Sequence, residues 1–309
     1  MLFCFSNDTI ERAKSAQVEL YKSDEELVDV CDVILSVVPP RDAAATAQRV
    51  VDAVTGPFSS RRGDSDRLLY FADLNALAPS TVKSIAALFE QTRGRGRVRF
   101  IDGAIMGNPP SPKKPAQSGT ANTATVRTTT TTTAGWTVPS IPVSGPWKIA
   151  EIPLYGEKLA NTLNIRHISD EVGAASGLKM CFASLTKGFT ALAIQSFTTA
   201  KRLGVLDELR GEFQTLIPER WNTAERSVIG MAPNAYRWVR EMEEIALTFD
   251  EEGGFPQDLF QGVAKVYKAV AEDTVLGQEK VGKRKRGLDV NDMAAAMAEG
   301  LEKKKKKND

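Results

Sequence analysis

The stretch Gly173-Ala-Ala-Ser-Gly-Leu-Lys-Met-Cys-Phe-Ala-Ser-Leu-Thr-Lys-Gly-Phe-Thr-Ala-Leu192 decides the organisation of this chain. Large apolar side chains recur in it at steps of four and three residues, which predicts an amphipathic helix. The predicted buried stripe consists of Leu178, Phe182, Leu185, Phe189 and Leu192. Strands alternate with helices before this segment, and only helices are predicted after it. We therefore expect the helix at a domain boundary, where ligand sites tend to form.

Lys179 lies on the flank of the predicted stripe. Its neighbours one turn away, Ala175, Ser176 and Ala183, are small, so the lysine has room beside it for a ligand. The competing interpretation is a core helix whose lysine only extends to water along its flank. A second lysine, Lys187, is interpreted as a surface or interface residue.

Length and composition restrict the class of protein. The chain has 309 residues, enough for two domains, and is 42% hydrophobic and 26% charged, as is usual for globular proteins. A formal net charge of +1 creates no global attraction to nucleic acid or anionic membranes. Three cysteines and one histidine are too widely spaced for a metal site, and they suggest reduced thiols in a cytoplasmic protein. No apolar run reaches the roughly 18 residues of a membrane span, and no signal-peptide core is present.

The first 170 residues alternate between predicted strands and helices. Near-continuous apolar runs predict strands buried on both faces over 33–38 and 68–72, and a third strand is expected over 98–101. The other elements predicted in this half are strands over 2–5, 18–20 and 165–168 and helices over 11–16, 41–54, 79–89 and 147–163. This order predicts a doubly wound α/β sheet.

Polar or turn residues follow the predicted strands, at Asn7, Pro39, Asp73 and Asp102. Ligands of open parallel sheets bind along this carboxyl edge. However, the first hundred residues lack the Gly-x-Gly-x-x-Gly turn that would hold a pyrophosphate at a helix N-terminus. We therefore expect the first βαβ unit to be missing, because the chain either is N-terminally truncated or lacks this phosphate-binding turn.

Composition also predicts the domain limits. The segment 109–139 is rich in proline and threonine and is interpreted as a disordered insertion in a partial Rossmann-like domain over 1–170. A helical domain is expected over 171–280. A basic, flexible tail is expected over 281–309, read either as a nuclear localisation signal or as a solvated end of the chain.

The helical half carries further candidate residues. The segment 233–249 predicts a long helix with Trp238, Met242, Ile245 and Phe249 on one face. Arg237 lies in this helix and is a candidate for holding a substrate carboxylate or phosphate, with a solvated charge as the alternative. His167 likewise has a functional and a structural interpretation, as a base or as a structural histidine.

Together these features resemble the β-hydroxyacid dehydrogenases, a superfamily that includes 6-phosphogluconate dehydrogenase. The resemblance covers most of the chain outside the insertion and the tail, and it is most specific over Gly173 to Lys187. It points to a branch whose helical C-terminal domain has no assigned substrate. It implies an incomplete Rossmann-type parallel sheet followed by an all-α, 6-phosphogluconate-dehydrogenase-like domain. It also implies a homodimer formed through the C-terminal helices.

The resemblance assigns cofactor and catalytic residues by position. Lys179 matches the catalytic lysine. Asn7-Asp8-Thr9 matches a ribose-binding Asn-Arg-Thr turn, and Asp8 in place of arginine favours NAD over NADP because it would repel a 2′-phosphate. Val38 with Pro39 matches an apolar strand followed by a proline turn near the cofactor, and Asn75 falls in a further cofactor-binding segment.

The resemblance places substrate contacts at Asp102, Met106 and Gly107, and Ser176 and Arg237 complete the predicted substrate-binding residues. The family's serine is replaced here by Met106, its last glycine by Asn108 and its asparagine after the lysine by Ala183. These departures suggest a different or less polar substrate than the standard hydroxyacids.

The predicted function is that of an NAD(P)-dependent oxidoreductase acting on a CH–OH group, with Lys179 as general acid or base toward a small hydroxyacid-like substrate. A free lysine has a pKa of about 10.4 and cannot act as a base at neutral pH, so burial must lower the pKa of Lys179. The alternative is a catalytically inactive, truncated binding or dimerisation module. Nucleic-acid binding rests on the basic tail alone and is disfavoured by the near-zero net charge.

Overall fold

The structure is a computed structural model, and it describes residues 7–56, 67–90, 98–112, 132–133, 135–280 and 283–308. The chain divides into two compact units. Unit 1 comprises Met1–Asn75 and Pro79–Ser176, and unit 2 comprises Ala76–Ala78 and Gly177–Asp309. The division at Ser176 lies later than the expected limit at residue 170, because the first turn of the central helix is hydrogen-bonded within unit 1.

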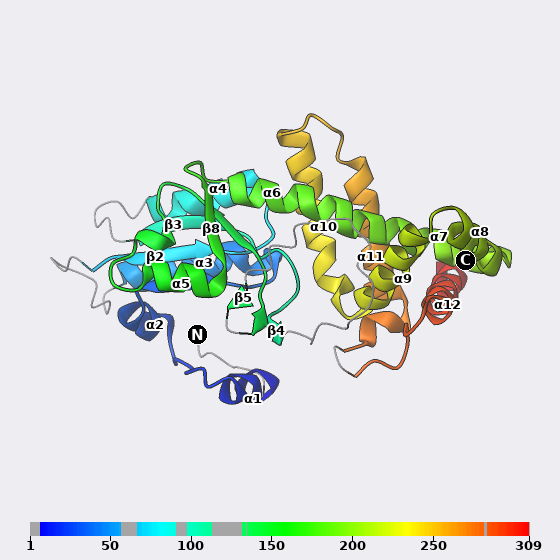
Figure 1. The fold of residues 1–309 in the computed structure, drawn as a ribbon, viewed down its shortest axis with the longest axis horizontal. Helices are drawn as coiled ribbons and strands as arrows, with labels where there is room; N and C mark the ends of the chain where they lie inside the picture. The colour runs from blue at the N-terminus through cyan, green and yellow to red at the C-terminus, as the bar shows by residue number, and fades with distance from the viewer. Residues whose placement is uncertain are drawn as a thin grey trace. The chain divides into compact units, whose positions relative to one another are not determined.

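Unit 1 is built on a five-stranded sheet of order β1-β2-β3-β7-β8 (Figure 1). Its strands are β1 (Val33–Ser36), β2 (Leu69–Asp73), β3 (Val98–Gly103), β7 (Ile141–Ser144) and β8 (Ile165–Ser169). The pairs β1–β2, β2–β3 and β7–β8 are parallel, whereas β3 and β7 are antiparallel. The carboxyl ends of β1, β2 and β3 therefore meet at one edge of the sheet.

Five α-helices of the described residues belong wholly to unit 1. They are α1 (Asn7–Ser15), α2 (Asp24–Val30), α3 (Ala43–Thr55), α4 (Pro79–Glu90) and α5 (Gly156–Leu163). The start of α2 is capped by the Ser23 hydroxyl, which accepts a hydrogen bond from the Glu26 N–H at 3.2 Å. Buried aromatic rings of β2, α4 and β3 pack together, with Phe71 and Phe89 4.8 Å apart between ring centroids.

Several predictions for unit 1 need correction. The β1 strand is the edge strand of the sheet and is half-buried, so it is not covered on both faces; Val37, which follows it, is 60% exposed. The segment 18–20 is not a strand, and its apolar side chains are exposed. The helix predicted over 147–163 is shorter in the structure, where this segment contains α5 and a separate 3-10 turn, Ile149–Glu151. Isolated apolar pairs cannot distinguish a strand from an exposed loop without knowledge of their neighbours.

The segment expected to be disordered is partly structured. Three two-residue strands, β4 (Ser111–Pro112), β5 (Thr132–Thr133) and β6 (Trp136–Thr137), form a small antiparallel sheet of order β4-β6-β5. The rest of the predicted insertion over 113–131, like the strand predicted over 2–5, lies outside the described residues.

Unit 2 is helical, and α6 (Ala174–Ala183) begins at the end of unit 1 and continues into it. The helices that follow are the π-helical turn η3 (Ser184–Gly188), α7 (Phe189–Leu203), α8 (Leu206–Leu216), α9 (Pro218–Met231), α10 (Ala235–Glu251), α11 (Asp258–Asp273) and α12 (Val290–Asn308). The predicted apolar face of α10 is confirmed, because Met242 and Ile245 are fully buried and Trp238 and Phe249 pack against the same core.

The prediction that the apolar stripe of the central helix is buried is wrong for four of its five residues, whereas Phe189 packs against the core of unit 2. Leu178, Phe182, Leu185 and Leu192 are 39%, 46%, 80% and 56% exposed, respectively. The core is reached by the other side of the helix, through Met180, Ala183, Ala191, Ile194 and Phe197. The helix has two apolar faces, and the one rich in alanine packs inside the unit because small side chains allow close approach.

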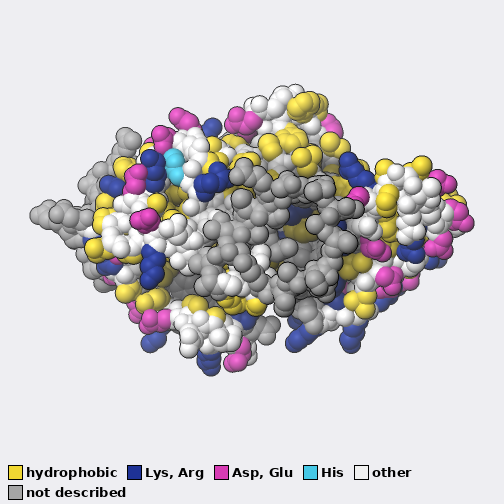
Figure 2. Space-filling model, viewed as in Figure 1, with side chains coloured by type: hydrophobic (Ala, Val, Ile, Leu, Met, Phe, Trp, Pro, Cys, Tyr) yellow, Lys and Arg dark blue, Asp and Glu magenta, His cyan; other side chains and the backbone are white. Residues whose placement is uncertain are grey.

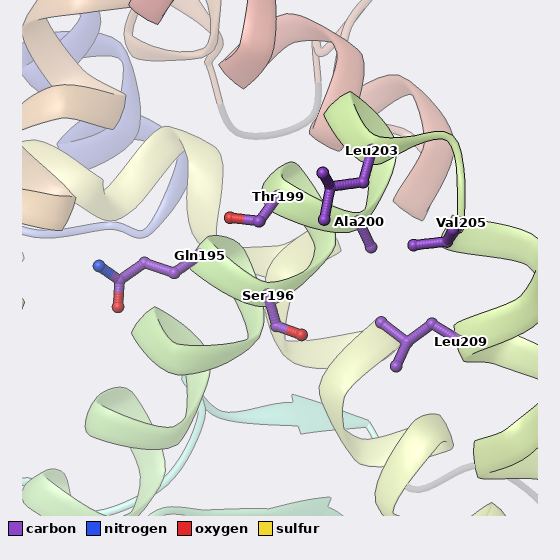
Figure 3. A pocket seen from close by; sticks show the side chains of 7 residues that line it. All are labelled: Gln195, Ser196, Thr199, Ala200, Leu203, Val205 and Leu209. Atoms are coloured by element: carbon purple, nitrogen blue, oxygen red, sulfur yellow. The ribbon is translucent and has the colours of Figure 1, made fainter.

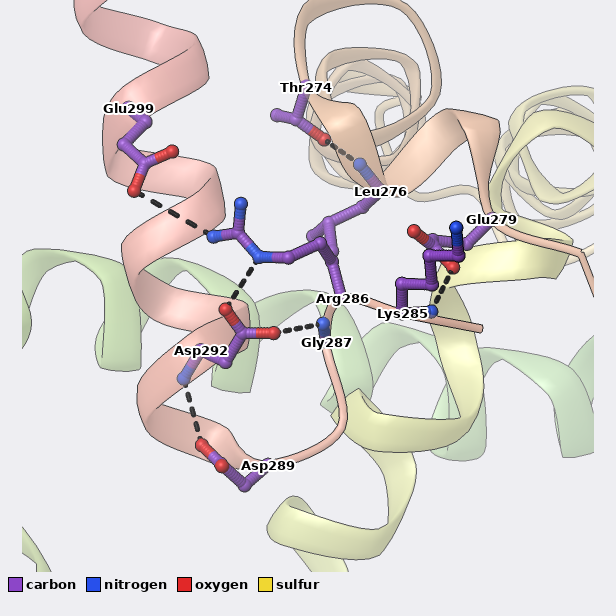
Figure 4. Close-up of polar contacts among 9 residues, drawn as sticks. All are labelled: Thr274, Leu276, Glu279, Lys285, Arg286, Gly287, Asp289, Asp292 and Glu299. Carbon is purple, nitrogen blue, oxygen red and sulfur yellow. Dashed lines mark hydrogen bonds and ion pairs between the residues drawn. The ribbon is translucent and has the colours of Figure 1, made fainter. Parts of the chain in front are cut away.

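The basic tail expected to be flexible is mostly α12, which is packed into unit 2. Val290, Met293 and Ala294 of this helix are fully buried. The segment before it is held by Asp292, which accepts hydrogen bonds from Arg286 Nε at 2.7 Å and from the Gly287 N–H at 2.5 Å (Figure 4). Burial alone would raise the pKa of Asp292, but these hydrogen bonds and the Arg286 charge lower it. The lysine run from 303 to 307 thus ends a packed helix.

Among the helices that the structure describes, none combines the length and the apolar character needed to cross a membrane.

Candidate functional site

A row of buried polar side chains crosses the sheet of unit 1. Ser36, Asp73 and Asp102 are paired in register across β1, β2 and β3, and Asp102 is paired with Ser144 of β7. None of the four is more than 3% exposed. Buried polar groups need hydrogen-bond partners. The partners of these four side chains therefore show which parts of the fold each one holds in place.

Asp102 anchors the N-terminus of α6. Its Oδ2 accepts hydrogen bonds from the Gly173 N–H at 2.9 Å, the Ser176 N–H at 3.2 Å and the Ser144 hydroxyl at 2.8 Å, and its Oδ1 accepts one from the Ser176 hydroxyl at 2.6 Å. The Ser144 hydroxyl accepts one from the Ala175 N–H at 3.0 Å. A carboxylate here satisfies the N–H groups that a helix start leaves without partners and complements the helix dipole.

The turn before α6 requires a glycine. Gly173 has a φ of +105°, which side chains disfavour, and a Cβ atom there would lie 3.1 Å from Lys83 Cε and 3.2 Å from Pro79 Cβ. The glycine therefore brings its own N–H close enough for Asp102 to bind it.

Asn75 joins the ends of β1 and β2. Its side-chain oxygen accepts a hydrogen bond from the Val38 N–H at 2.7 Å, and its amide nitrogen donates to the Ser36 hydroxyl at 3.1 Å. The Asn75 N–H donates to Asp73 Oδ1 at 2.9 Å. These bonds fix the two strand-end loops that include the predicted cofactor-binding residues Val38, Pro39 and Asn75.

Asp73 retains one buried oxygen, Oδ2, without a hydrogen-bond partner among the described residues. Burial raises the pKa of Asp73 to about 6; the hydrogen bonds from Asn75 oppose this shift, and the Asp102 charge adds to it. An unsatisfied carboxylate oxygen at the carboxyl edge of a parallel sheet can accept a hydrogen bond from a ligand hydroxyl or amide.

Other residues predicted for unit 1 lie in different settings. Asn7, Asp8 and Thr9 form the first turn of α1 rather than a turn after a paired strand. Met106 is half-buried and its N–H donates to the Ser140 carbonyl at 2.8 Å, while Gly107 beside it is exposed. The roles assigned to these residues stay predictions.

His167 has the geometry of a structural residue. Its Nε2 donates to the Gly145 carbonyl at 2.9 Å and lies 3.5 Å from Asp170 Oδ1. In the described part of the chain, no cluster of three His, Cys, Asp or Glu side chains could hold a metal ion.

In unit 2, the structure groups two predicted residues with two that were not predicted. Lys179 on α6 interacts electrostatically with Arg237 and Glu241 on α10, and Lys187 in η3 does so with all three. Lys187 Nζ forms an ion pair with Glu241 Oε2, and Glu241 Oε1 is buried with no hydrogen-bond partner among the described residues. We call Lys179, Lys187, Arg237 and Glu241 the amine cluster.

Burial is the main influence on both amines of the cluster. It lowers the pKa of Lys179, and Arg237 acts in the same direction while Glu241 opposes it. It lowers the pKa of Lys187 to about 8, against the attraction of Glu241 and with the repulsion of Lys179. The cluster therefore contains an amine that loses its proton much more easily than an ordinary lysine does.

The helix geometry around Lys187 is unusual. Lys187 lies in the π-helical turn η3, and hydroxyl groups bind backbone carbonyls in and just before this turn. The Tyr267 hydroxyl donates to the Lys187 carbonyl at 2.5 Å, and the Ser184 hydroxyl donates to the Cys181 carbonyl at 2.7 Å. Lys187 Nζ also lies 4.9 Å from the centroid of the Trp238 ring. Single π-helical turns occur frequently at functional sites.

Glu241 and Lys187 were missed by the analysis of the sequence, which assigned Lys187 to the surface. A signal for Glu241 was present, because Glu241 falls three residues after Trp238 and four before Ile245, on the apolar face predicted for this helix. A carboxylate on a buried face requires a cationic partner. The sequence could not name that partner, since Lys187 is 54 residues away along the chain.

An open apolar groove of about 430 Å³ lies elsewhere in unit 2 (Figure 3). It is lined by Gln195, Ser196, Thr199, Ala200, Leu203, Val205 and Leu209. Leu203, which lines the groove, is 71% exposed. Hydrophobic atoms also appear at the tip of the α10–α11 hairpin (Figure 2), where Phe255 and Leu259 are each 66% exposed.

Comparison with known proteins supports this description. Residues 200–270 match the family model described as a domain of unknown function, DUF1932. A solved conserved protein of unknown function, MTH1747, whose description reports similarity to 3-hydroxyacid dehydrogenases, superposes with a TM-score of 0.52 and 23% identity over 87% of this chain and 85% of that one. The chain has the 3-hydroxyacid dehydrogenase fold. The fold class expected from the resemblance is thereby confirmed, including the helical C-terminal half.

Other relatives with this fold are more distant or shorter in their overlap. Mycobacterium tuberculosis 3-hydroxyisobutyrate dehydrogenase, solved with L-serine, has a TM-score of 0.52 at 14% identity, over 94% of this chain and 87% of that one. An uncharacterized 28.5 kDa protein of Methanothermus fervidus is 26% identical over 204 residues, 66% of this chain. The match spans 62% of the length of that curated relative.

Ligands of open parallel sheets bind at the carboxyl edge of the strands, so this edge of unit 1 is where a dinucleotide would be held. At this edge, Asp73 Oδ2 is a buried acceptor without a hydrogen-bond partner among the described residues. The described residues offer no glycine-rich turn that leads from a strand into a helix and could hold a pyrophosphate. The described strand ends thus offer a hydrogen-bond acceptor but no site for a pyrophosphate.

Proposed function

We propose that this protein is an NAD(P)-dependent oxidoreductase of the β-hydroxyacid dehydrogenase type that acts on the CH–OH group of a small hydroxyacid-like substrate. The observation that carries the proposal is the amine cluster, in which the half-buried Lys179 has a lowered pKa. The 3-hydroxyacid dehydrogenase fold supports the reaction class.

In the proposed reaction, Lys179 moves one proton. When the substrate is oxidised, the Lys179 Nζ lone pair takes the proton from the substrate hydroxyl as the C–O single bond becomes a carbonyl. A bound nicotinamide would supply the acceptor for the hydride that leaves the carbinol carbon with its bonding electrons. In the reductive direction, the Lys179 ammonium returns the proton to the carbonyl oxygen. Arg237 would bind the carboxylate of the substrate.

The cofactor would be held along the strand-end edge of unit 1, by Asp73, Asn75, Val38 and Pro39. We propose NAD rather than NADP because, in the family resemblance, Asp8 replaces the arginine that would pair with a 2′-phosphate. For the substrate side, Met106, Gly107 and Ser176 remain the candidates, while Asp102 acts by holding the start of α6.

The test uses fluorescence titration of NADH and NADPH with the full chain, followed by turnover assays on a panel of β-hydroxy acids. Lys179→Met should abolish turnover and leave NADH affinity nearly unchanged. Lys201→Met is the matched control, because Lys201 is an exposed lysine of the adjoining helix α7. Turnover by Lys179→Met at the wild-type rate would refute the assignment.

We also propose a homodimer formed through the exposed apolar stripe of α6 and α7. Leu178, Phe182, Leu185, Leu192 and Leu203 are large apolar side chains of these two helices, and all are more than one third exposed. Exposed apolar surfaces of this kind mark protein interfaces. Leu185→Glu should convert the dimer to a monomer in analytical ultracentrifugation, whereas Lys201→Met should not; a wild-type chain that is monomeric at all concentrations would exclude the dimer.

A second candidate is a non-catalytic binding or dimerisation module of the same fold. It is favoured by the absence of a pyrophosphate-binding turn among the described residues. A chain that dimerises but quenches neither NADH nor NADPH fluorescence would favour this candidate. We propose a cytoplasmic location for either function, since Cys31 and Cys181, the cysteines within the described residues, form no disulfide.

A further inference from the structure

The connection between β2 and α4 belongs to unit 2 for three residues. Unit 1 contains the chain up to Asn75 and again from Pro79, whereas Ala76–Ala78 is part of unit 2, and we call it the inserted segment. Its last two residues are fully buried, and its first residue packs against the hydrophobic core of unit 2. Both ends of the inserted segment are peptide bonds to the strand-end region that carries the candidate cofactor residues.

A buried carboxylate from α10 holds one end of the inserted segment. Glu244 is 1% exposed, and its Oε2 accepts a hydrogen bond from the Ala78 N–H at 2.8 Å. Its Oε1 accepts one from Arg240 Nη2 at 2.5 Å. Ala78 directly precedes α4, so its N–H needs a partner from outside that helix. A side chain 166 positions further along the chain supplies this partner.

The other end of the inserted segment continues into Asn75, which is 4% exposed and holds the loop after β1. Asn75 Oδ1 accepts the hydrogen bond from the Val38 N–H at 2.7 Å, and Asn75 Nδ2 donates to the Ser36 hydroxyl at 3.1 Å. Consecutive Cα atoms are about 3.8 Å apart, so three residues of main chain leave Asn75 little freedom once Ala78 is fixed. The bond from Ala78 to Glu244 therefore limits where Asn75 can lie.

We propose that Glu244 is a positioning residue for the strand-end loops of unit 1. Its bond to the Ala78 N–H fixes the inserted segment, which places Asn75, and the Asn75 side chain in turn places Val38. This inference rests on the proposed function in that Asn75 and Val38 are taken as cofactor-binding residues. The role requires a hydrogen-bond acceptor at the reach of a glutamate side chain and does not require its negative charge.

Hydrogen exchange at single amides, measured by NMR on the full chain without cofactor, tests the proposal. Glu244→Gln keeps the length of the side chain and an acceptor oxygen but removes the charge, whereas Glu244→Asp keeps the charge and is one methylene shorter. Glu244→Asp should speed exchange at the Ala78 and Val38 amides by roughly tenfold, because the Ala78 N–H loses its buried acceptor. Glu244→Gln should leave both amides near their wild-type rates.

The Val38 amide separates positioning from a merely structural role. A variant that only loosened α10 would speed exchange within unit 2 and leave Val38, which is bonded by the Asn75 side chain in unit 1, at its wild-type rate. Glu243→Gln is the matched control, because Glu243 also pairs with Arg240, at 3.2 Å, and it should change neither amide. The proposal is overturned if Glu244→Asp leaves Val38 unchanged, or if Glu244→Gln speeds its exchange as much as Glu244→Asp does.

If the Glu244 variants fold poorly, the wild-type chain decides. Exchange at low urea concentrations should show the Ala78 and Val38 amides opening together, with the same dependence on urea, and different dependences would overturn the proposal.

The affinity for NADH is the second readout. In fluorescence titrations, Glu244→Asp should weaken NADH binding several-fold while Glu244→Gln binds like wild type, and equal affinity of all three chains would overturn the positioning role. A wild-type chain that does not bind NADH would contradict the proposed function. Because amide exchange is measured without cofactor, it would still decide whether Glu244 positions the loops, so the two failures are distinguishable.

Discussion

Asp102 in unit 1 and Glu241 in unit 2 are both buried carboxylates, and they differ in how completely they are hydrogen-bonded. Both oxygens of Asp102 accept hydrogen bonds from the start of α6 or from Ser144. One oxygen of Glu241 is bound by Lys187 and the other has no hydrogen-bond partner among the described residues. A fully bonded carboxylate fixes a helix, whereas one with an unpartnered oxygen retains capacity to interact with a proton or a ligand.

Asp73 belongs with Glu241 in this comparison, although it lies beside Asp102 in the same row of the sheet. Its Oδ2 is buried and has no hydrogen-bond partner in the described part of the chain, and burial raises the pKa of Asp73 to about 6. Proximity in the sheet therefore does not decide the role of an acidic residue. What decides it is whether a helix start supplies N–H donors to the carboxylate, as α6 does for Asp102.

The largest effect should follow the loss of Asp102. Asp102→Ala leaves the Gly173 and Ser176 N–H groups buried without partners, so the free energy of unfolding of unit 1 should fall by about 4 kcal/mol. Urea denaturation measures it, and Asp52→Ala on the exposed side of α3 is the control. A loss below about 1 kcal/mol would show that the anchoring of α6 does not depend on this carboxylate.

Asp73→Asn should change how stability depends on pH. The pKa of the native Asp73 carboxyl is raised from 3.8 to about 6, so the native state holds this proton more tightly than the unfolded state does. Its favourable contribution is complete below the unfolded pKa and is lost as the pH rises through about 6, a change of about 2–3 kcal/mol. Asp73→Asn should therefore gain stability relative to wild type as the pH rises from acid to neutral.

The measurement for Asp73 is urea denaturation of both chains at acid and at neutral pH, with Asp52→Asn as the control. If the free energies of unfolding of wild type and Asp73→Asn differed by the same amount at all pH values, folding would not change the pKa of Asp73. The contrast between Asp73 and the fully hydrogen-bonded Asp102 would then be lost.

Tyr267→Phe tests the support of the π-helical turn. The variant removes the hydroxyl that donates to the Lys187 carbonyl and leaves that carbonyl without this donor. The free energy of unfolding of unit 2 should fall by about 1–2 kcal/mol. Thermal denaturation should show the change, while Tyr236→Phe, at a 58% exposed position, should melt like wild type; equal melting of all three chains would contradict the assigned role.

The smallest effect is expected at the ion pair before α12. Arg286→Gln removes the contacts of Arg286 with Asp292 and Glu299, at 2.7 Å and 3.7 Å (Figure 4). Because Arg286 is about one third exposed, the loss should be about 0.5–1 kcal/mol and should shrink in high salt. A loss as large as that of Asp102→Ala would remove the contrast between surface and buried charge in this chain.

The sequence predicted most of the strands of the unit 1 sheet and the buried face of α10, but not the buried face of the central helix. The strands at 33–38, 68–72, 98–101 and 165–168 are present as β1, β2, β3 and β8, because continuous apolar runs bounded by polar turns report burial directly. The α10 face with Met242 and Ile245 was predicted for the same reason. The central helix was different, because both of its faces are apolar and periodicity cannot choose between them.

The amino-acid sequence by itself determined the class of fold, the position of the central helix and the presence of Lys179 in it, since these depend on local patterns of apolar and small residues. Only the tertiary structure decided that Asp102 holds the start of that helix, that the leucine row faces outward, and that Lys187 and Glu241 share the cluster of Lys179. Those outcomes depend on contacts between residues 54 to 74 positions apart, which no local pattern encodes.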